Sequence, residues 1–245
     1  MVVALELFTR FGFAGAFRWL HVLFGIAWIG LLYYFNFVQV PAFAELSAGA
    51  RNEAITKLAT RALWWFRWAA LATAIFGLLI IAATSDYFSR DNASKTSILI
   101  GMLFALTMLY NVWMVIWPNQ KIVIANAANV LAGGQADPNS AAAARKAFLA
   151  SRQNVIFSVP MLWFMVATAH FYAGPFGNPG AGKAWGFAVI AIVIWAALEA
   201  NALGYIGGTA PSQTKVIYEP VQNVMITAFV LWAVLWLLSE ALLKQ

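Results

Sequence analysis

The sequence predicts an all-α fold, a polytopic transmembrane helical bundle with about six spans. Two observations predict it. Of the 245 residues, 63% are hydrophobic and only 10% are charged, which is more apolar side chain than a water-soluble domain can cover. The apolar residues also gather in stretches of about 20, the length that a helix needs to cross the hydrocarbon core of a bilayer. Because no backbone polar group can be left unpaired in lipid, each stretch is expected to be helical.

The expected spans follow one another along one transmembrane domain, residues 1–245, with polar or glycine-rich turns between most of them. They cover residues 18–40, 62–83, 98–117, 155–173, 184–206 and 221–243.

The longest connection, residues 118–152, contains two helix-like segments on either side of the turn sequence GGQADPNS. We expect the first segment to be an interfacial helix that lies on the membrane surface, and the second to lead into the fourth span.

The basic residues predict the orientation and the surroundings of the bundle. The net charge is +6, and the loops after spans one, three and five carry more Lys and Arg than the loops on the other side. By the positive-inside rule, these loops face the cytoplasm and both termini are periplasmic in a bacterial inner membrane. The positive charge is therefore expected to face anionic lipid, and we expect no nucleic-acid partner.

The absence of cysteine excludes several kinds of redox centre. With no Cys in the chain, it can form no disulfide, no iron–sulfur cluster, no thiolate zinc site and no covalently attached c-type haem. Any redox cofactor of this chain must be held in another way.

The two histidines are the first candidate site. His21 lies about one turn into span one and His170 near the end of span four. Span one enters the membrane on the side where span four leaves it, so both imidazoles should lie at a similar depth. Such a pair could supply the axial ligands of one haem b, with Arg18 near a propionate and Gly25 allowing close approach of the macrocycle. Alternatively, each histidine is an interfacial residue bonded to a carbonyl or a lipid headgroup.

A second candidate site, the inner polar cluster, is expected at the opposite end of the bundle, where polar side chains lie within or beside the spans. Glu199 is the one acidic residue clearly inside a span, so Arg67 or Arg152 is its expected partner. The cluster is either a proton or substrate site or a structural ion pair. Its members are Asn36, Arg67, Asn111, Arg152, Asn154 and Glu199.

Two stretches resemble a known family. RWLHVLFGIAWIGLLYYFNFVQVPAF (residues 18–43) and SRQNVIFSVPMLWFMVATAHF (residues 151–171) are similar to the urate oxidase N-terminal (PuuD-type) membrane domain family. A weaker likeness, in the His-x-x-x-Gly-x-x-Trp stretch that starts at His21, is to haem-binding membrane oxidases of the HemJ type. The positions that match the family's pattern are His21, Trp28, Gly30, Asn36, Arg152, Asn154, Pro160 and His170.

The resemblance implies a redox-linked membrane protein. Longer family members carry a C-terminal c-type cytochrome that takes electrons from urate oxidation, whereas this chain has no CxxCH motif. The leading hypothesis is therefore a haem-b-linked redox or electron-transfer protein, a candidate oxidoreductase that needs a separate cytochrome c or quinone. Two alternatives remain: a non-catalytic subunit of a larger respiratory or photosynthetic membrane complex, and a small-molecule transporter that uses Glu199, Arg67 and Arg152.

Overall fold

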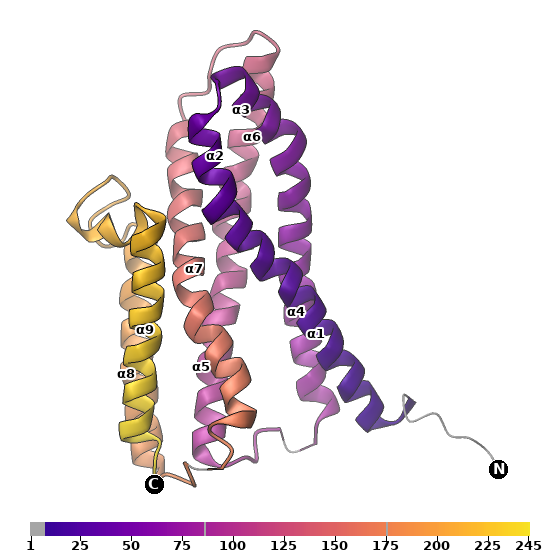
Figure 1. The fold of residues 1–245 in the computed structure, drawn as a ribbon, viewed down its shortest axis with the longest axis vertical. Coiled ribbons are helices and arrows are strands. Elements are labelled where there is room, and N and C mark those ends of the chain that lie inside the picture. The colour runs from indigo at the N-terminus through magenta and orange to yellow at the C-terminus, as the bar shows by residue number, and fades with distance from the viewer. Residues whose placement is uncertain (1–7, 86, 175) are drawn as a thin grey trace, which may run out of the picture.

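The structure is a computed structural model that describes residues 8–85, 87–174 and 176–245 (Figure 1). Helices, and no strands, make up the regular structure of these residues. In chain order they are α1 (Arg10–Tyr33), η2 (Tyr34–Gln39), α2 (Val40–Glu45), α3 (Ala48–Ala54), η3 (Ile55–Ala59), α4 (Thr60–Ala83), α5 (Asn92–Tyr110), η4 (Asn111–Ile116), α6 (Trp117–Leu131), α7 (Ser140–His170), α8 (Ala181–Ala202), η5 (Gln213–Tyr218) and α9 (Val221–Leu242).

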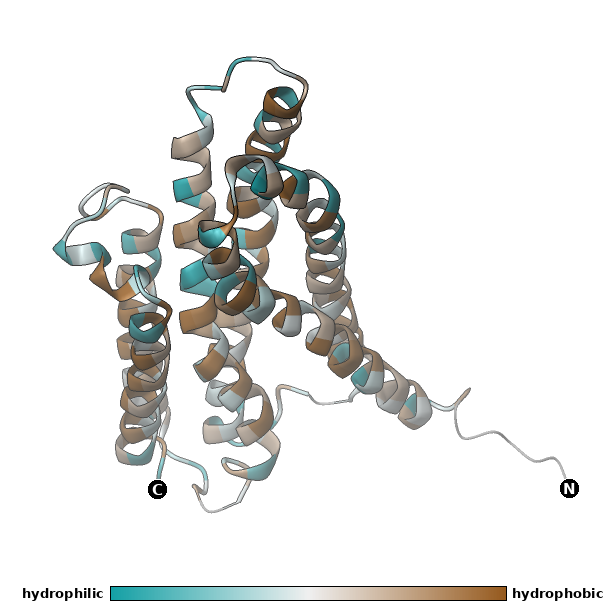
Figure 2. Ribbon diagram, turned by 45° about the horizontal axis from the view of Figure 1, so that its top comes forward, coloured by the Kyte–Doolittle hydropathy of each residue, from teal (hydrophilic) through white to brown (hydrophobic). Residues whose placement is uncertain are grey.

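Five helical segments in the described residues are long and apolar enough to cross a membrane, and Figure 2 shows hydrophobic residues along most of their length. This confirms the prediction of an all-α membrane protein. The five segments are Arg10–Glu45, Ala48–Ala83, Asn92–Leu131, Ala181–Ala202 and Val221–Leu242. The sixth long helix, α7, has a polar first half and runs beside them (Figure 1).

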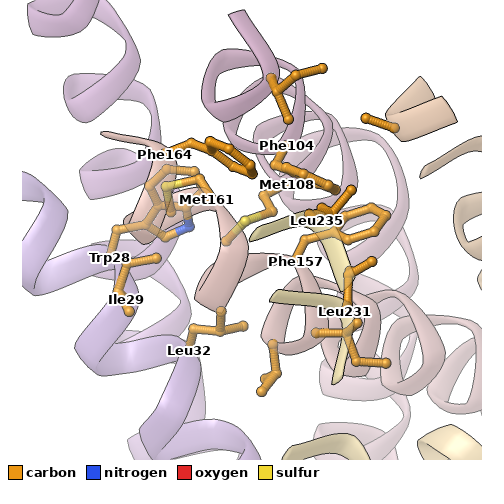
Figure 3. Packing of buried hydrophobic residues seen from close by; sticks show 14 of the residues in the cluster. Trp28, Ile29, Leu32, Phe104, Met108, Phe157, Met161, Phe164, Leu231 and Leu235 are labelled. Atoms are coloured by element: carbon orange, nitrogen blue, oxygen red, sulfur yellow. The ribbon is translucent and has the colours of Figure 1, made fainter. Parts of the chain in front are cut away.

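Helix α7 lies in the middle of the bundle. It packs on α5, α9 and α6, while α1 packs mainly on α4. Figure 3 shows the core around it, where Phe104 of α5 and Leu235 of α9 lie near Phe157 of α7, and Leu32 of α1 belongs to the same buried cluster. Since α1 begins and α9 ends at the same end of the bundle (Figure 1), the long segments run antiparallel to one another in sequence order.

The connection over residues 118–152 differs from the expectation. Its first segment is helical, but it continues directly from α5 through η4 into α6, a run of 40 residues that is about 60 Å long. The hydrocarbon core is only about 30 Å thick, so α6 and the first half of α7 extend past it as a packed pair. The segment is therefore the end of a long helix and not a separate interfacial helix.

Proline does not end this helix because a π-helical turn precedes it. In η4 the Trp117 N–H bonds to the carbonyl of Val112, five residues back, and this wider turn leaves room for Pro118, which has no N–H to donate. The same arrangement occurs at η2, where the Val40 N–H bonds to the carbonyl of Phe35 just before Pro41. Both long helices therefore pass through a proline without a break.

Candidate functional site

One cavity surrounds His21. This His21 crevice encloses about 90 Å³ between α1, α4, α5 and α7. Its wall is almost entirely apolar, and its polar or sulfur-bearing side chains include His21, Trp28, Thr73, Tyr87, Met102 and Met165.

The imidazole of His21 is fixed in one orientation. Its Nδ1 lies 2.8 Å from the carbonyl oxygen of Thr73. A carbonyl can only accept, so Nδ1 carries a proton, and in the neutral imidazole Nε2 then keeps its lone pair. A metal-binding histidine is commonly oriented by such a hydrogen bond from its other ring nitrogen to a carbonyl. A Cβ at Gly77 would lie 3.1 Å from Cε1 of the ring, so the ring packs closely against α4 because position 77 has no side chain.

Trp28 is a second side chain with a polar group that lines the same crevice. Trp28 is only 2% exposed and lines the crevice, yet its indole Nε1 has no hydrogen-bond partner among the described residues. Figure 3 shows this side chain beside Met161 and Ile29. Leaving a buried donor unpaired costs about 1–3 kcal/mol, so the Trp28 indole has an unused donor on a residue that lines the crevice.

The structure does not bring the two histidines into one pocket. His170 is the exposed last residue of α7 and is not among the residues that line the His21 crevice. Arg18 is exposed one turn before His21. A Cβ at Gly25 would make only an ordinary 3.9 Å contact with Thr73. The glycine that the ring requires is Gly77. It could not be singled out from the sequence, because His21 lies 56 positions away in the chain.

The inner polar cluster is assembled in part. Asn111 donates to Asn154 Oδ1 at 2.9 Å and to Glu199 Oε2 at 3.3 Å, and Asn154 donates to the carbonyl of Met108 at 3.0 Å. These three side chains from η4, α7 and α8 form one buried network.

The expected ion pair of Glu199 is wrong. The Arg67 guanidinium lies over the ring of Trp117, 3.9 Å from its centre, and Arg152 lies over Phe148 at 4.9 Å. Within the described residues neither forms a salt bridge with Glu199. The Arg residues are long enough to reach an aromatic ring on their own helix or a neighbouring one, and these rings hold them away from the carboxylate.

Several buried polar atoms in this region have no hydrogen-bond partner. In the described part of the chain they include Oε1 of Glu199, Oδ1 of Asn111, and Nε and Nη1 of Arg152, whose side chain is 2% exposed. Asn36 belongs to a different group of contacts, because it donates to the carbonyl of Leu32 and to Ser151 Oγ, both at 2.8 Å.

A larger cavity, the inner cavity, lies beside Asn36. It measures about 520 Å³. The sequence analysis singled out Asn36 as a polar residue of span one, but not Gln120 or Ser151, because these two lie outside the expected spans. Its polar lining residues are Asn36, Gln39, Arg51, Gln120, Arg145 and Ser151.

The long apolar helices, the histidine crevice and the polar inner end together define an integral membrane protein of the helical-bundle class. The family model for the urate oxidase N-terminal domain matches residues 68–234. This is well over half of the chain, and the chain belongs to that family. The matched range includes Arg152, Asn154 and His170 but begins after His21. No curated protein and no solved structure matches this chain.

Proposed function

We propose that this chain is a membrane-embedded redox protein that binds one haem b, with His21 as an axial ligand. The single observation that supports the proposal is the Nδ1 hydrogen bond of His21 to Thr73, which leaves Nε2 free to coordinate iron. Membership of the urate oxidase N-terminal family supports a redox role in which an oxidisable substrate such as urate supplies electrons. The electrons would leave to a separate cytochrome c or quinone.

The residues around His21 fit one histidine ligand better than two. Besides His21, the crevice presents the thioethers of Met102 and Met165, which can also act as axial ligands. His170 lies outside this set. The crevice encloses less than the roughly 300–1,000 Å³ of ordinary ligand pockets, so we expect haem binding to widen it. Haem would supply one-electron redox chemistry, while His21 and Gly77 would hold its position and the apolar wall would exclude water.

An optical spectrum with extraction of haem tests the proposal on protein purified from bacterial membranes in mild detergent. We expect a Soret band and about one haem per chain in the wild type. The His21→Ala variant should lose the band. The matched variant His170→Ala removes the other imidazole and should keep it.

A wild-type protein that is colourless after expression with ample haem would overturn the proposal. An unchanged spectrum in His21→Ala would also overturn the assignment of His21. A colourless protein that purifies only together with other membrane subunits would support the alternative of a non-catalytic subunit.

A further inference from the structure

The carboxyl group of Glu199 is buried without a cationic partner. Glu199 is 7% exposed and lies in α8, one of the segments apolar enough to cross a membrane. It takes part in no salt bridge among the described residues. An ionised carboxylate in such surroundings is costly unless a cation or several hydrogen-bond donors compensate its charge. The groups around Glu199 therefore decide which form it takes.

The cationic side chains on the elements around Glu199 are committed to other groups. Helix α8 packs on α5, α7, α9 and η5. On α7, the Arg145 guanidinium forms an ion pair with Glu219, and the Arg152 guanidinium lies over an aromatic ring of its own helix. On η5, the buried Lys215 ammonium group donates to two backbone carbonyls, each at 2.7 Å. No neighbour of this kind is left to neutralise a carboxylate at Glu199 within the described part of these elements.

The hydrogen-bond network fixes the orientation of the Asn111 amide. The carbonyl of Met108 can only accept, so Nδ2 of Asn154 must face it, at 3.0 Å. The Oδ1 of Asn154 then faces Asn111, whose Nδ2 donates to it at 2.9 Å. The same Nδ2 donates to Glu199 Oε2 at 3.3 Å. The Oδ1 of Asn111 is therefore turned away from Asn154, and it has no partner among the described residues.

The amide of Asn111 and the carboxyl of Glu199 each keep one unsatisfied acceptor. Oδ1 of Asn111 and Oε1 of Glu199 are both buried without a hydrogen-bond partner in the part of the chain that the structure describes. They belong to two planar groups that one N–H···O contact already joins. A proton on Oε1 turns one of the two acceptors into a donor. Tyr218 cannot supply that donor, because its hydroxyl donates to Gln153 Oε1 at 2.6 Å.

A metal ion fits these atoms less well than a proton. Calcium and magnesium take about six or more oxygen ligands, whereas this network leaves only the two oxygens of Asn111 and Glu199 without partners among the described residues. The described ranges also contain no group of three or more His, Asp or Glu side chains that could hold a metal. A single proton, in contrast, needs only one donor atom and one acceptor.

We propose that Glu199 is a proton-binding site, in which its protonated carboxyl group forms a cyclic hydrogen-bonded pair with the Asn111 amide. The acid Oε1–H donates to Asn111 Oδ1 and the Asn111 Nδ2–H donates to Glu199 Oε2. One proton thus removes the buried charge and satisfies both free acceptors. Met102 lines the His21 crevice, and Asn111 follows it at a distance of about 14 Å along the same continuous helix. The proton site is therefore separate from the crevice and does not depend on haem.

Infrared difference spectroscopy of the detergent-solubilised full chain tests the proposal. A protonated carboxylic acid has a C=O stretching band that an ionised carboxylate lacks. Subtracting the spectrum of Glu199→Gln from that of the wild type at pH 7 should leave one such band, which shifts in heavy water. The matched control is Glu240→Gln, because Glu240 forms an ion pair with Lys244 at 3.9 Å and its difference spectrum should contain only carboxylate bands. The same carboxylate-only result for Glu199→Gln would overturn the proposal.

Two further measurements test the pairing with Asn111. Glu199→Gln is neutral and keeps one donor and one acceptor in place, so it should unfold in detergent at about the wild-type temperature. A much lower unfolding temperature would overturn the proposal, because it would show that the native fold needs the ionised form. Asn111→Leu removes the amide, so the acid band should move to higher frequency as its O–H loses a partner. A band at the wild-type frequency in this variant would overturn the pair.

Discussion

The position of the His21 ring depends on a residue that has no side chain. A Cβ at Gly77 would lie 3.1 Å from Cε1 and 3.2 Å from Nδ1 of the imidazole, closer than ordinary contacts. The Gly77→Ala variant should push the ring from α4 and weaken its bond to the Thr73 carbonyl. We expect a loss of about 1 kcal/mol in stability, measured by thermal unfolding in detergent, together with a weaker or shifted Soret band.

The matched control is Gly186→Ala in α8, where an added Cβ would meet nothing within 4 Å. Because alanine favours the helix by up to about 1 kcal/mol over glycine, this variant should be as stable as the wild type or more stable. If Gly77→Ala is stabilised by a similar amount, the ring is not held by this contact.

For individual residues, the sequence predicts which polar side chains are buried together better than it predicts which group each one contacts. Asn111, Asn154 and Glu199 were expected at one end of the bundle, and they form one network there. The partner of Glu199 was wrong because an arginine side chain can reach an aromatic ring as easily as a carboxylate. That choice depends on the rotation of each helix, which the spacing of polar residues leaves open.

The π turn before Pro118 leads to a prediction about the stability of the long helix that contains it. Deleting Val115 from η4 removes the extra residue of the wide turn, which turns α6 by about 100° relative to α5. Pro118 would then clash with the preceding carbonyls, and Ile116, buried on the inner side, would face another direction. We expect the deletion to lower the unfolding temperature sharply.

Pro118→Ala is the control for this deletion, because it keeps the residue count and only restores an N–H. It should change stability by about 1 kcal/mol or less. A deletion variant that unfolds at the wild-type temperature would show that α6 does not depend on the register set by η4.

Hydropathy located the elements but not their ends. The expected span at 221–243 has nearly the same bounds as α9 (Val221–Leu242), and the expected span at 98–117 covers most of α5, all of η4 and the first residue of α6. Hydropathy reports only the part of a helix that suits lipid, whereas α6 and α7 continue because they pack on each other. The π turns were not expected, since one inserted residue hardly changes an apolar pattern when most faces are apolar.

The orientation of the whole bundle can be tested because the chain has no native cysteine. Ala136, in the loop between α6 and α7, and Ala173, just after α7, are both exposed. They lie at opposite ends of α7, Ala136 before its first residue and Ala173 after its last. From the positive-inside rule, a membrane-impermeant thiol reagent added to intact spheroplasts should label Ala173→Cys but not Ala136→Cys.

Permeabilised cells provide the control, because both variants should react once the reagent reaches both sides. Labelling of Ala136→Cys alone in intact spheroplasts would reverse the orientation. Labelling of both positions from one side would contradict a crossing by α7.

The central position of α7 has a consequence for biogenesis. Its first half carries Arg145, Lys146 and Arg152, and it is not among the segments apolar enough to cross a membrane unaided. A translocon that releases helices by partitioning would admit α5 and α8 readily but not this one. Helix α7 is therefore expected to enter the membrane with the help of protein neighbours: α5 and α6, which precede it in the chain, and α9, which follows it and also packs on it.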